Sequence, residues 1–109
     1  MKYDEGIYTV NKGETITVDI QPSSSLGAGQ VVASLDGNTI TRPISFKVTR
    51  DVGLLHQLSI IYYFVLAPNG EYTVTITGDA PGSDTIVRKV RAPLPETHAK
   101  VNYLFDVIA

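Results

Sequence analysis

The sequence predicts an all-β protein, an antiparallel β-sandwich of seven to nine strands with Greek-key or jelly-roll-like connections. Residues 71–77 alternate without error between apolar and polar side chains, the period of a strand with one buried face. Turn signals recur at the short spacing of a sandwich, and no stretch has the period of an amphipathic helix. With 109 residues and 43% hydrophobic content, residues 1–109 are expected to form a single domain.

The first half of the chain contains five expected strands. They are Ile7–Val10, Glu14–Ile20, Val31–Leu35, Asn38–Thr41 and Ile44–Thr49. Asn11-Lys12-Gly13 and Asp36-Gly37 are expected turns, because asparagine and glycine tolerate positive φ and a type I′ hairpin needs it at both central residues. Residues 21–29 combine a proline, three serines and two glycines, which is the composition of a loop.

The second half contains four expected strands. They are Leu54–Ala67, Glu71–Thr77, Asp84–Arg91 and Ala99–Ile108. The first of these is the most apolar stretch of the chain, and we interpret it as a strand buried on both faces. A buried helix over residues 54–58 is an alternative that periodicity leaves open. Pro93 and Pro95 favour a connection after residue 91, since proline cannot donate to a central ladder.

A tyrosine begins the alternating segment 71–77 and follows a Leu-x-Pro turn. Leu66, Pro68 and Tyr72 together resemble the tyrosine corner of Greek-key sandwiches. The role implied for these three residues is structural.

Three segments are similar to bacterial pre-peptidase C-terminal domains. Tyr8–Ile20 resembles their first hairpin, Gly70–Gly78 their "aGtYtvtvtg" strand, and Tyr103–Val107 their closing "Y-x-l-x-V" strand. Immunoglobulin-like and fibronectin-like modules are the nearest alternatives. The resemblance implies a non-catalytic accessory domain beside an exported bacterial enzyme. Some such domains bind calcium through acidic residues near their start, where this chain has only Asp4 and Glu5.

Composition excludes several classes of function. The net charge of −2 argues against a nucleic-acid binder, which needs a basic field, and no apolar run is long enough for membrane insertion. The absence of cysteine excludes disulfides and thiolate metal sites. Abundant threonine, serine and glycine with little lysine favour an extracellular or cell-surface protein, with the periplasm and the cytoplasm as alternatives. The first residues lack the apolar region of a signal peptide, so we expect a module excised from a larger exported protein.

No residue pattern predicts a catalytic site, and we expect no enzymatic activity. The serines at 23–25 lack a nucleophile elbow. His56 and His98 are far apart in the sequence and are expected to be satisfied or exposed. The one cofactor that the sequence leaves open is calcium, with Asp79, Ser83 and Asp84 as ligands in a loop that offers carboxylate, hydroxyl and carbonyl oxygens. The alternative is a solvated turn whose side chains bind nearby amides.

The most apolar strand provides the candidate interface. Ile61, Tyr63 and Val65 share one face, which is either core or an exposed aromatic and aliphatic stripe. An exposed stripe would favour a protein interface, including a homodimer, over a sugar platform, because the chain has no tryptophan.

A basic strand provides a second candidate surface. Lys89 and Arg91 share a face with Val87, whereas Arg88 shares the other face with Ile86 and Val90. These charges either protect an edge strand from aggregation or bind an acidic partner. The sequence therefore predicts an interaction module that binds a protein partner or neighbouring domains. The alternatives are a self-associating structural subunit and a small carbohydrate-binding module.

Overall fold

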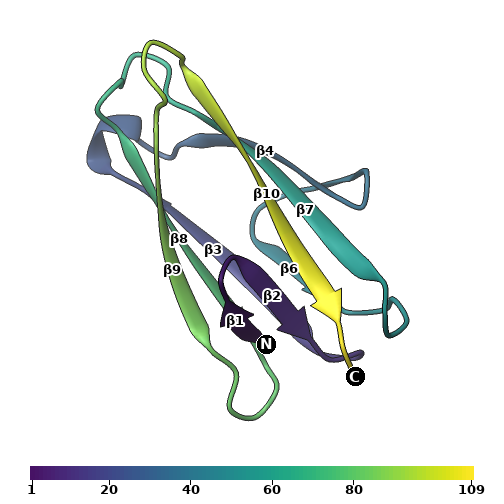
Figure 1. Ribbon diagram of the computed structural model, residues 1–109. Coiled ribbons are helices and arrows are strands. Elements are labelled where there is room, and N and C mark those ends of the chain that lie inside the picture. The colour runs from purple at the N-terminus through teal and green to yellow at the C-terminus, as the bar shows by residue number, and fades with distance from the viewer.

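The computed structural model describes residues 1–109 and consists of two β-sheets packed face to face (Figure 1). The six-stranded sheet has the order β1-β2-β10-β7-β4-β5, and the four-stranded sheet has the order β6-β3-β8-β9. The strands are β1 (Lys2–Asp4), β2 (Ile7–Val10), β3 (Thr15–Pro22), β4 (Gln30–Leu35), β5 (Asn38–Ile40), β6 (Ile44–Lys47), β7 (Leu55–Tyr63), β8 (Glu71–Gly78), β9 (Thr85–Arg91) and β10 (His98–Val107). The all-β sandwich predicted from the sequence is confirmed. No helix of the chain is long and apolar enough to span a membrane.

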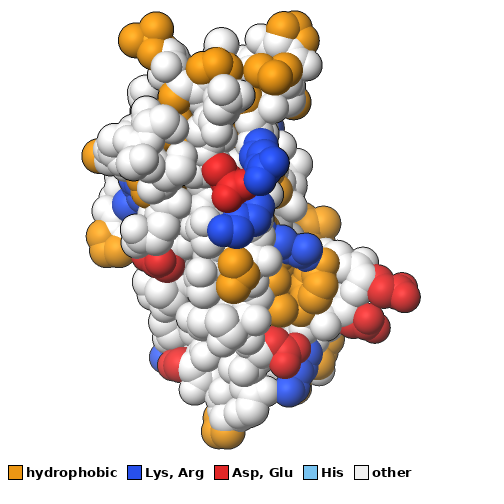
Figure 2. Space-filling model, turned by 90° about the vertical axis from the view of Figure 1, so that its left-hand side faces the viewer, with side chains coloured by type: hydrophobic (Ala, Val, Ile, Leu, Met, Phe, Trp, Pro, Cys, Tyr) orange, Lys and Arg blue, Asp and Glu red, His pale blue; other side chains and the backbone are white.

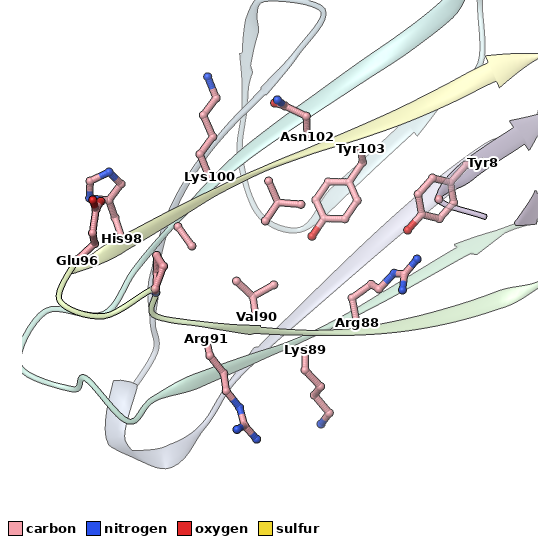
Figure 3. Close-up of a pocket in the computed structure, with 14 residues that line it drawn as sticks. Tyr8, Arg88, Lys89, Val90, Arg91, Glu96, His98, Lys100, Asn102 and Tyr103 are labelled. Atoms are coloured by element: carbon pink, nitrogen blue, oxygen red, sulfur yellow. The ribbon is translucent and has the colours of Figure 1, made fainter. Parts of the chain in front are cut away.

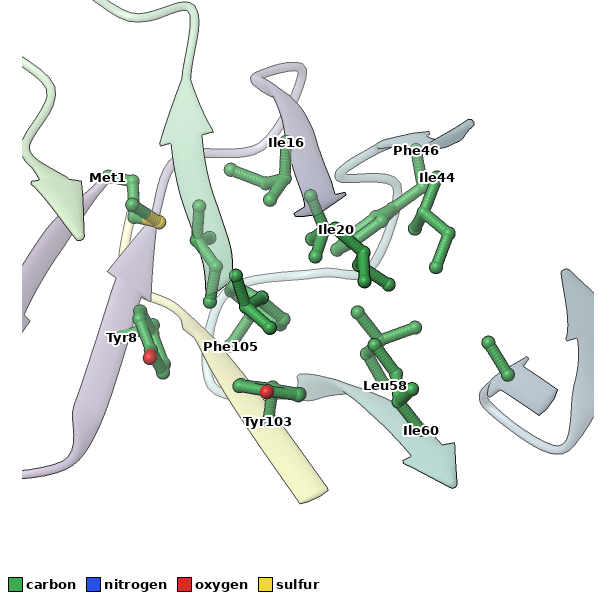
Figure 4. Packing of buried hydrophobic residues seen from close by; sticks show 14 of the residues in the cluster. Met1, Tyr8, Ile16, Ile20, Ile44, Phe46, Leu58, Ile60, Tyr103 and Phe105 are labelled. Atoms are coloured by element: carbon green, nitrogen blue, oxygen red, sulfur yellow. The ribbon is translucent and has the colours of Figure 1, made fainter. Parts of the chain in front are cut away.

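The core lies between the sheets and is formed by alternate residues of the facing strands (Figure 4). In β8, Tyr72, Val74 and Ile76 are fully buried and the intervening threonines face outward, as the alternation predicts. Phe105 of β10 lies near the middle of the core, where its ring contacts those of Tyr8 and Phe46 at centroid distances of 5.1 and 5.4 Å.

Two polar residues are buried with this apolar core. They are Glu14 and His56. The Glu14 carboxylate accepts the Asn11 N–H at 3.2 Å and pairs with the Met1 ammonium group. His56 contacts the Asp36 carboxylate through Nδ1 at 2.6 Å. Both buried polar residues therefore have partners, as buried polar groups require.

The expectation that every strand pair is antiparallel is wrong at one place. β2 runs parallel to β10, with Tyr8 opposite Phe105 and Val10 opposite Val107. Short turns force neighbouring strands to be antiparallel, but β2 and β10 come from opposite ends of the chain. Their direction is therefore set by how the chain closes the sheet, which periodicity does not record.

The expectation that residues 54–67 form a strand buried on both faces is also wrong. β7 spans Leu55–Tyr63 and buries only one face, which carries His56, Leu58, Ile60 and Tyr62. Its other face is the outer surface of the six-stranded sheet. The strand ends at Tyr63, and the chain then turns through Leu66, whose φ is 59° and whose side chain is 99% exposed.

The structure has ten strands because a three-residue strand, β1, precedes the first one expected. β1 pairs antiparallel with β2, with Lys2 opposite Thr9 and Asp4 opposite Ile7. Glu5 and Gly6 form the turn and have φ values of 48° and 87°. Positive φ at both central residues is the signature of a tight hairpin turn whose twist matches its strands.

Candidate functional site

The largest hollow of the molecule lies along one open side of the sandwich, between β9 and β10. It has a volume of about 750 Å³. Figure 2 shows this side, where apolar side chains line a hollow next to basic ones. β9 is the last strand of its sheet, and β10 has β2 beside it only over residues 105–107. Two strand edges without a neighbour therefore border this hollow, which we call the open groove.

Strand alternation decides which side chains enter the open groove (Figure 3). Arg88 and Val90 of β9, Tyr103 of β10 and Tyr8 of β2 point into it. Their strand neighbours point away, and these are Lys89, Arg91, Lys100 and Asn102. The groove therefore has apolar and tyrosine walls with a single inward cation.

Arg88 is that cation, and it has no carboxylate partner. Its guanidinium carbon lies 4.5 Å from the centroid of the Tyr3 ring, and the residue is half-buried. Lys89 and Arg91, on the opposite face of β9, both pair with Glu71, at 3.6 and 2.5 Å. The cation–π contact orients Arg88 but leaves its N–H donors available to an anionic group in the groove.

Two tyrosine hydroxyl groups line the open groove together with Arg88. The Tyr103 hydroxyl lies 2.8 Å from the buried Tyr62 hydroxyl, whereas the Tyr8 hydroxyl has no hydrogen-bond partner within the chain. Burial, and then the proximity of Tyr103, raises the pKa of Tyr8 to about 12. Burial also raises the pKa of Tyr103, although the hydrogen bond from Tyr62 and the charge of Arg88 oppose this. Both side chains are neutral hydroxyls at neutral pH, suited to hydrogen bonding rather than to proton abstraction.

A second polar cluster joins Asp36 at the end of β4 to His56 in β7. His56 Nδ1 lies 2.6 Å from Asp36 Oδ2, and His56 Nε2 accepts the backbone N–H groups of Thr49 and Arg50 at 3.2 and 3.4 Å. Because Nε2 accepts, Nδ1 carries the proton and donates to Asp36. Both ring nitrogens are thus occupied. The pair resembles half of a hydrolytic triad only in composition, since Nε2 is not available to a nucleophile.

The predicted interface residues lie on the outer surface, away from the open groove. Ile61 and Tyr63 share the outer face of β7 and are half-buried, whereas Val65 lies beyond the end of the strand and is 59% exposed. Tyr63 has Gln30 and His98 opposite it on the neighbouring strands. Polar residues therefore flank Tyr63 on both neighbouring strands.

Replacing Tyr63 with alanine is expected to leave the domain folded. Tyr63 is only half-buried, and the one aromatic ring beside it is that of the exposed His98, at a centroid distance of 6.1 Å, so the free energy of unfolding should fall by no more than about 1 kcal/mol. Urea unfolding measures this, with the fully buried neighbour Tyr62→Ala as the contrasting variant. Unfolding of Tyr63→Ala to the same extent as Tyr62→Ala would show that Tyr63 belongs to the core.

Each residue proposed for calcium uses one side-chain oxygen in a hydrogen bond within the chain. Asp79 Oδ1 accepts the N–H of Thr15 at 2.8 Å, and Asp84 Oδ2 accepts the N–H of Tyr3 at 3.0 Å. Ser83 Oγ accepts the N–H of Gly78 at 3.1 Å. No group of three or more histidine, cysteine, aspartate or glutamate side chains is placed to hold a metal ion. The two aspartates thus bind amides of β3 and β1, far away in the sequence, and only Ser83 binds an amide of its own loop. Calcium binding stays a prediction.

Of the three residues that resemble a tyrosine corner, the structure places only Tyr72 in the core. Its hydroxyl donates to the Tyr63 carbonyl at 2.7 Å and accepts the Gln30 N–H at 3.0 Å. Leu66 and Pro68 are exposed in the turn that precedes β8.

Sequence reasoning did not find the open groove, although one signal pointed to it. Arg88 is in phase with Ile86 and Val90, so a charged residue stood among apolar ones on the inward face of a strand. Tyr8 and Tyr103 carried no such signal, because an inward tyrosine is ordinary in a sandwich core.

No family model, curated protein or solved structure matches this chain. It is an all-β sandwich with one open side, and its largest hollow holds a cation without a counter-charge.

Proposed function

We propose that this chain is a non-catalytic interaction module, an accessory domain of an exported bacterial protein, and that it holds its partner in the open groove. The observation that carries the proposal is Arg88. It is the one charged side chain directed into the largest hollow, and it forms no salt bridge.

The solvation cost of the half-buried Arg88 guanidinium supports an anionic ligand at this position. Partial burial of a guanidinium costs solvation, and the usual compensation is a carboxylate close by. On β9 the outward cations have that compensation from Glu71, whereas Arg88 does not. An anionic group in the groove would supply it, with the free Tyr8 hydroxyl as an additional donor.

The polar groups near the groove favour binding over catalysis. Tyr8 and Tyr103 stay protonated at neutral pH. His56, which does not line the groove, has both ring nitrogens engaged. The carboxylate that lines the groove, Glu96, lies at the end far from Arg88 (Figure 3). Export and bacterial origin are supported by the likeness to pre-peptidase C-terminal domains and by the abundance of threonine, serine and glycine with little lysine.

A selection from a phage library of random peptides against the immobilised domain tests this proposal. Peptides that bind the wild type are expected to bind Arg88→Gln at least about tenfold more weakly, the loss typical of one charge-assisted hydrogen bond. Lys89→Gln is the matched control, because it removes one charge from the next residue on the opposite face. No enriched peptide, or equal loss in both variants, would contradict the proposal. Urea unfolding of both variants confirms that each is folded.

A second candidate function is self-association through the outer face of the six-stranded sheet. The favouring observation is that Val32, which is 50% exposed, lies opposite Ile61 on that face. Light scattering with in-line size exclusion distinguishes the two. A single monomer mass at all concentrations supports the groove, and a mass that rises with concentration and falls in Ile61→Lys supports self-association.

A further inference from the structure

We infer that the open groove takes an extended peptide as an added β-strand, which pairs with the free edge of β10 and places an acidic side chain against Arg88. This inference rests on the proposed function and adds the mode of binding and the chemical class of the partner. It combines the backbone of β10, the walls of the groove and the charge within it.

The backbone of β10 has a free edge of strand geometry. Val107 N donates to Leu54 O at 3.0 Å, so odd-numbered residues of β10 direct their backbone groups to the β7 side. Ile108 N donates to Val10 O at 3.0 Å, so even-numbered residues direct theirs to the β2 side. The register with β7 is continuous from residue 98 to residue 106. His98, Lys100 and Asn102 therefore present N–H and C=O groups to the groove, where no strand pairs with them.

β2 already shows that this edge accepts a strand. It pairs with β10 over residues 105–107 and begins at Ile7, and Gly6 just before it lines the end of the groove. In Figure 1, β1 and β2 lie beside the lower part of β10, while its upper part has no neighbour on that side. An added strand would continue the line of β2 along residues 98–102, and it would close the open side of the sandwich. This is strand addition at a sheet edge, a recurring mode of peptide recognition.

The walls of the groove specify the side chains of the added strand. Val90, Ala99 and Val101 line the groove and suit small apolar side chains on alternate residues. Arg88, without a counter-charge and beside the Tyr8 hydroxyl, suits one glutamate or aspartate among them. Charge complementarity therefore favours an acidic segment.

The same walls argue against a sugar. Polysaccharides stack on exposed aromatic faces, but Tyr8 and Tyr103 are only 3% and 4% exposed. Unpaired backbone groups spaced along a strand match a peptide backbone, which repeats its own donors and acceptors at that spacing.

The test uses the peptide acetyl-Thr-Val-Thr-Glu-Thr-Val-Thr-amide together with the peptides selected from the library. On binding, hydrogen exchange at the amides of Lys100 and Asn102 is expected to slow, while Val101 and Tyr103, whose amides already face β7, should change little. Methylating the peptide amides on one edge should abolish binding, and methylating those on the other edge should not, because alternate N–H groups of a strand point in opposite directions.

Charge recognition is tested by a double-mutant cycle. Arg88→Gln is expected to weaken binding of the glutamate peptide about tenfold and to have little effect on the same peptide with glutamine in its place. Lys89→Gln should leave both affinities unchanged. Equal effects of Arg88→Gln on the two peptides would show that the acidic side chain does not meet Arg88.

The outcomes separate the inference from the proposed function. If selected peptides bind and depend on Arg88, but the Lys100 and Asn102 amides gain no protection, the strand mode is wrong and the interaction module stands. If neither the designed nor the selected peptides bind in the groove, both are overturned. If the chain instead forms a dimer, and dimer formation protects these amides, the inference of a peptide partner is overturned. The added strand would then come from a second copy of the chain.

Discussion

Replacing Tyr72 with phenylalanine is expected to lower the free energy of unfolding by about 1–3 kcal/mol, and replacing it with alanine by about 3–5 kcal/mol. The hydroxyl connects two strands of the facing sheet, because it donates to the carbonyl of Tyr63 at the end of β7 and accepts the N–H of Gln30 at the start of β4. Phenylalanine would leave both backbone groups without this partner in a place that water reaches poorly.

The alanine variant also removes the ring, which is fully buried. The ring meets Phe64 edge-on at 5.3 Å and Tyr62 at 5.2 Å. Gly29, with a φ of 71°, makes its approach possible, since a Cβ there would lie 2.8 Å from Tyr72 Cε1. Loss of the ring would therefore leave a cavity beside Tyr62, Phe64 and Gly29.

Urea unfolding of Tyr72→Phe, Tyr72→Ala and the wild type measures both effects. Tyr63→Phe is the matched control, because its hydroxyl forms no hydrogen bond within the chain and the change should stay within about 0.5 kcal/mol. If Tyr72→Phe were as stable as Tyr63→Phe, the hydroxyl would contribute nothing to the connection between the sheets.

Replacing Asp36 with asparagine is expected to lower the free energy of unfolding at pH 7 by about 1.5–3 kcal/mol, the range for hydrogen bonds to a charged group. Asp36 accepts the Gln57 N–H on one oxygen, at 2.8 Å, and His56 Nδ1–H on the other. An asparagine amide has one acceptor, so in either orientation its NH₂ group faces another donor. The substitution should not strain the backbone, because Asp36 has a φ of 52° and asparagine tolerates that region.

The cost of Asp36→Asn should also depend on pH. Burial would raise the pKa of Asp36, but the hydrogen bond from the Gln57 backbone, the contact with His56 and the charge of Arg50 together hold it below its ordinary value. The unfolded chain then binds more protons in acid than the folded one. The contribution of the carboxylate is therefore complete above about pH 4 and is lost as the pH falls through the folded pKa.

Thermal unfolding of Asp36→Asn and wild type between pH 7 and pH 3 tests this. The difference in melting temperature is expected to shrink below about pH 4. The exposed Asp19→Asn is the control, since the Asp19 carboxylate accepts hydrogen bonds only from the Gln21 side chain. A difference that stays constant down to pH 3 would mean that the ionised carboxylate is not what stabilises this cluster.

The local pattern of the sequence was sufficient for the all-β class and for most strands. In β8 the alternation of Tyr72, Val74 and Ile76 with threonines predicts both the strand and its buried face, because a strand's side chains alternate by geometry alone. The Asp36-Gly37 turn is equally local, since positive φ is a property of those two residues.

Pairing and exposure depend on segments far apart in the sequence. The apolar residues of β7 do not reveal that its outer face stays uncovered, and nothing near Tyr8 indicates that β2 runs parallel to β10. His56 illustrates the same limit, because its partners Asp36, Thr49 and Arg50 come from other segments.

The open groove is formed by tertiary packing alone and could not be predicted from the sequence. Alternation placed Arg88 on an inward face, but only the packing of the two sheets showed that this face meets a hollow beside Tyr8 and Tyr103 instead of a closed core. The sequence by itself determined which residues share a face of each strand. The tertiary structure decided what each face meets, because contacts between strands join residues whose separation along the chain leaves no periodic trace.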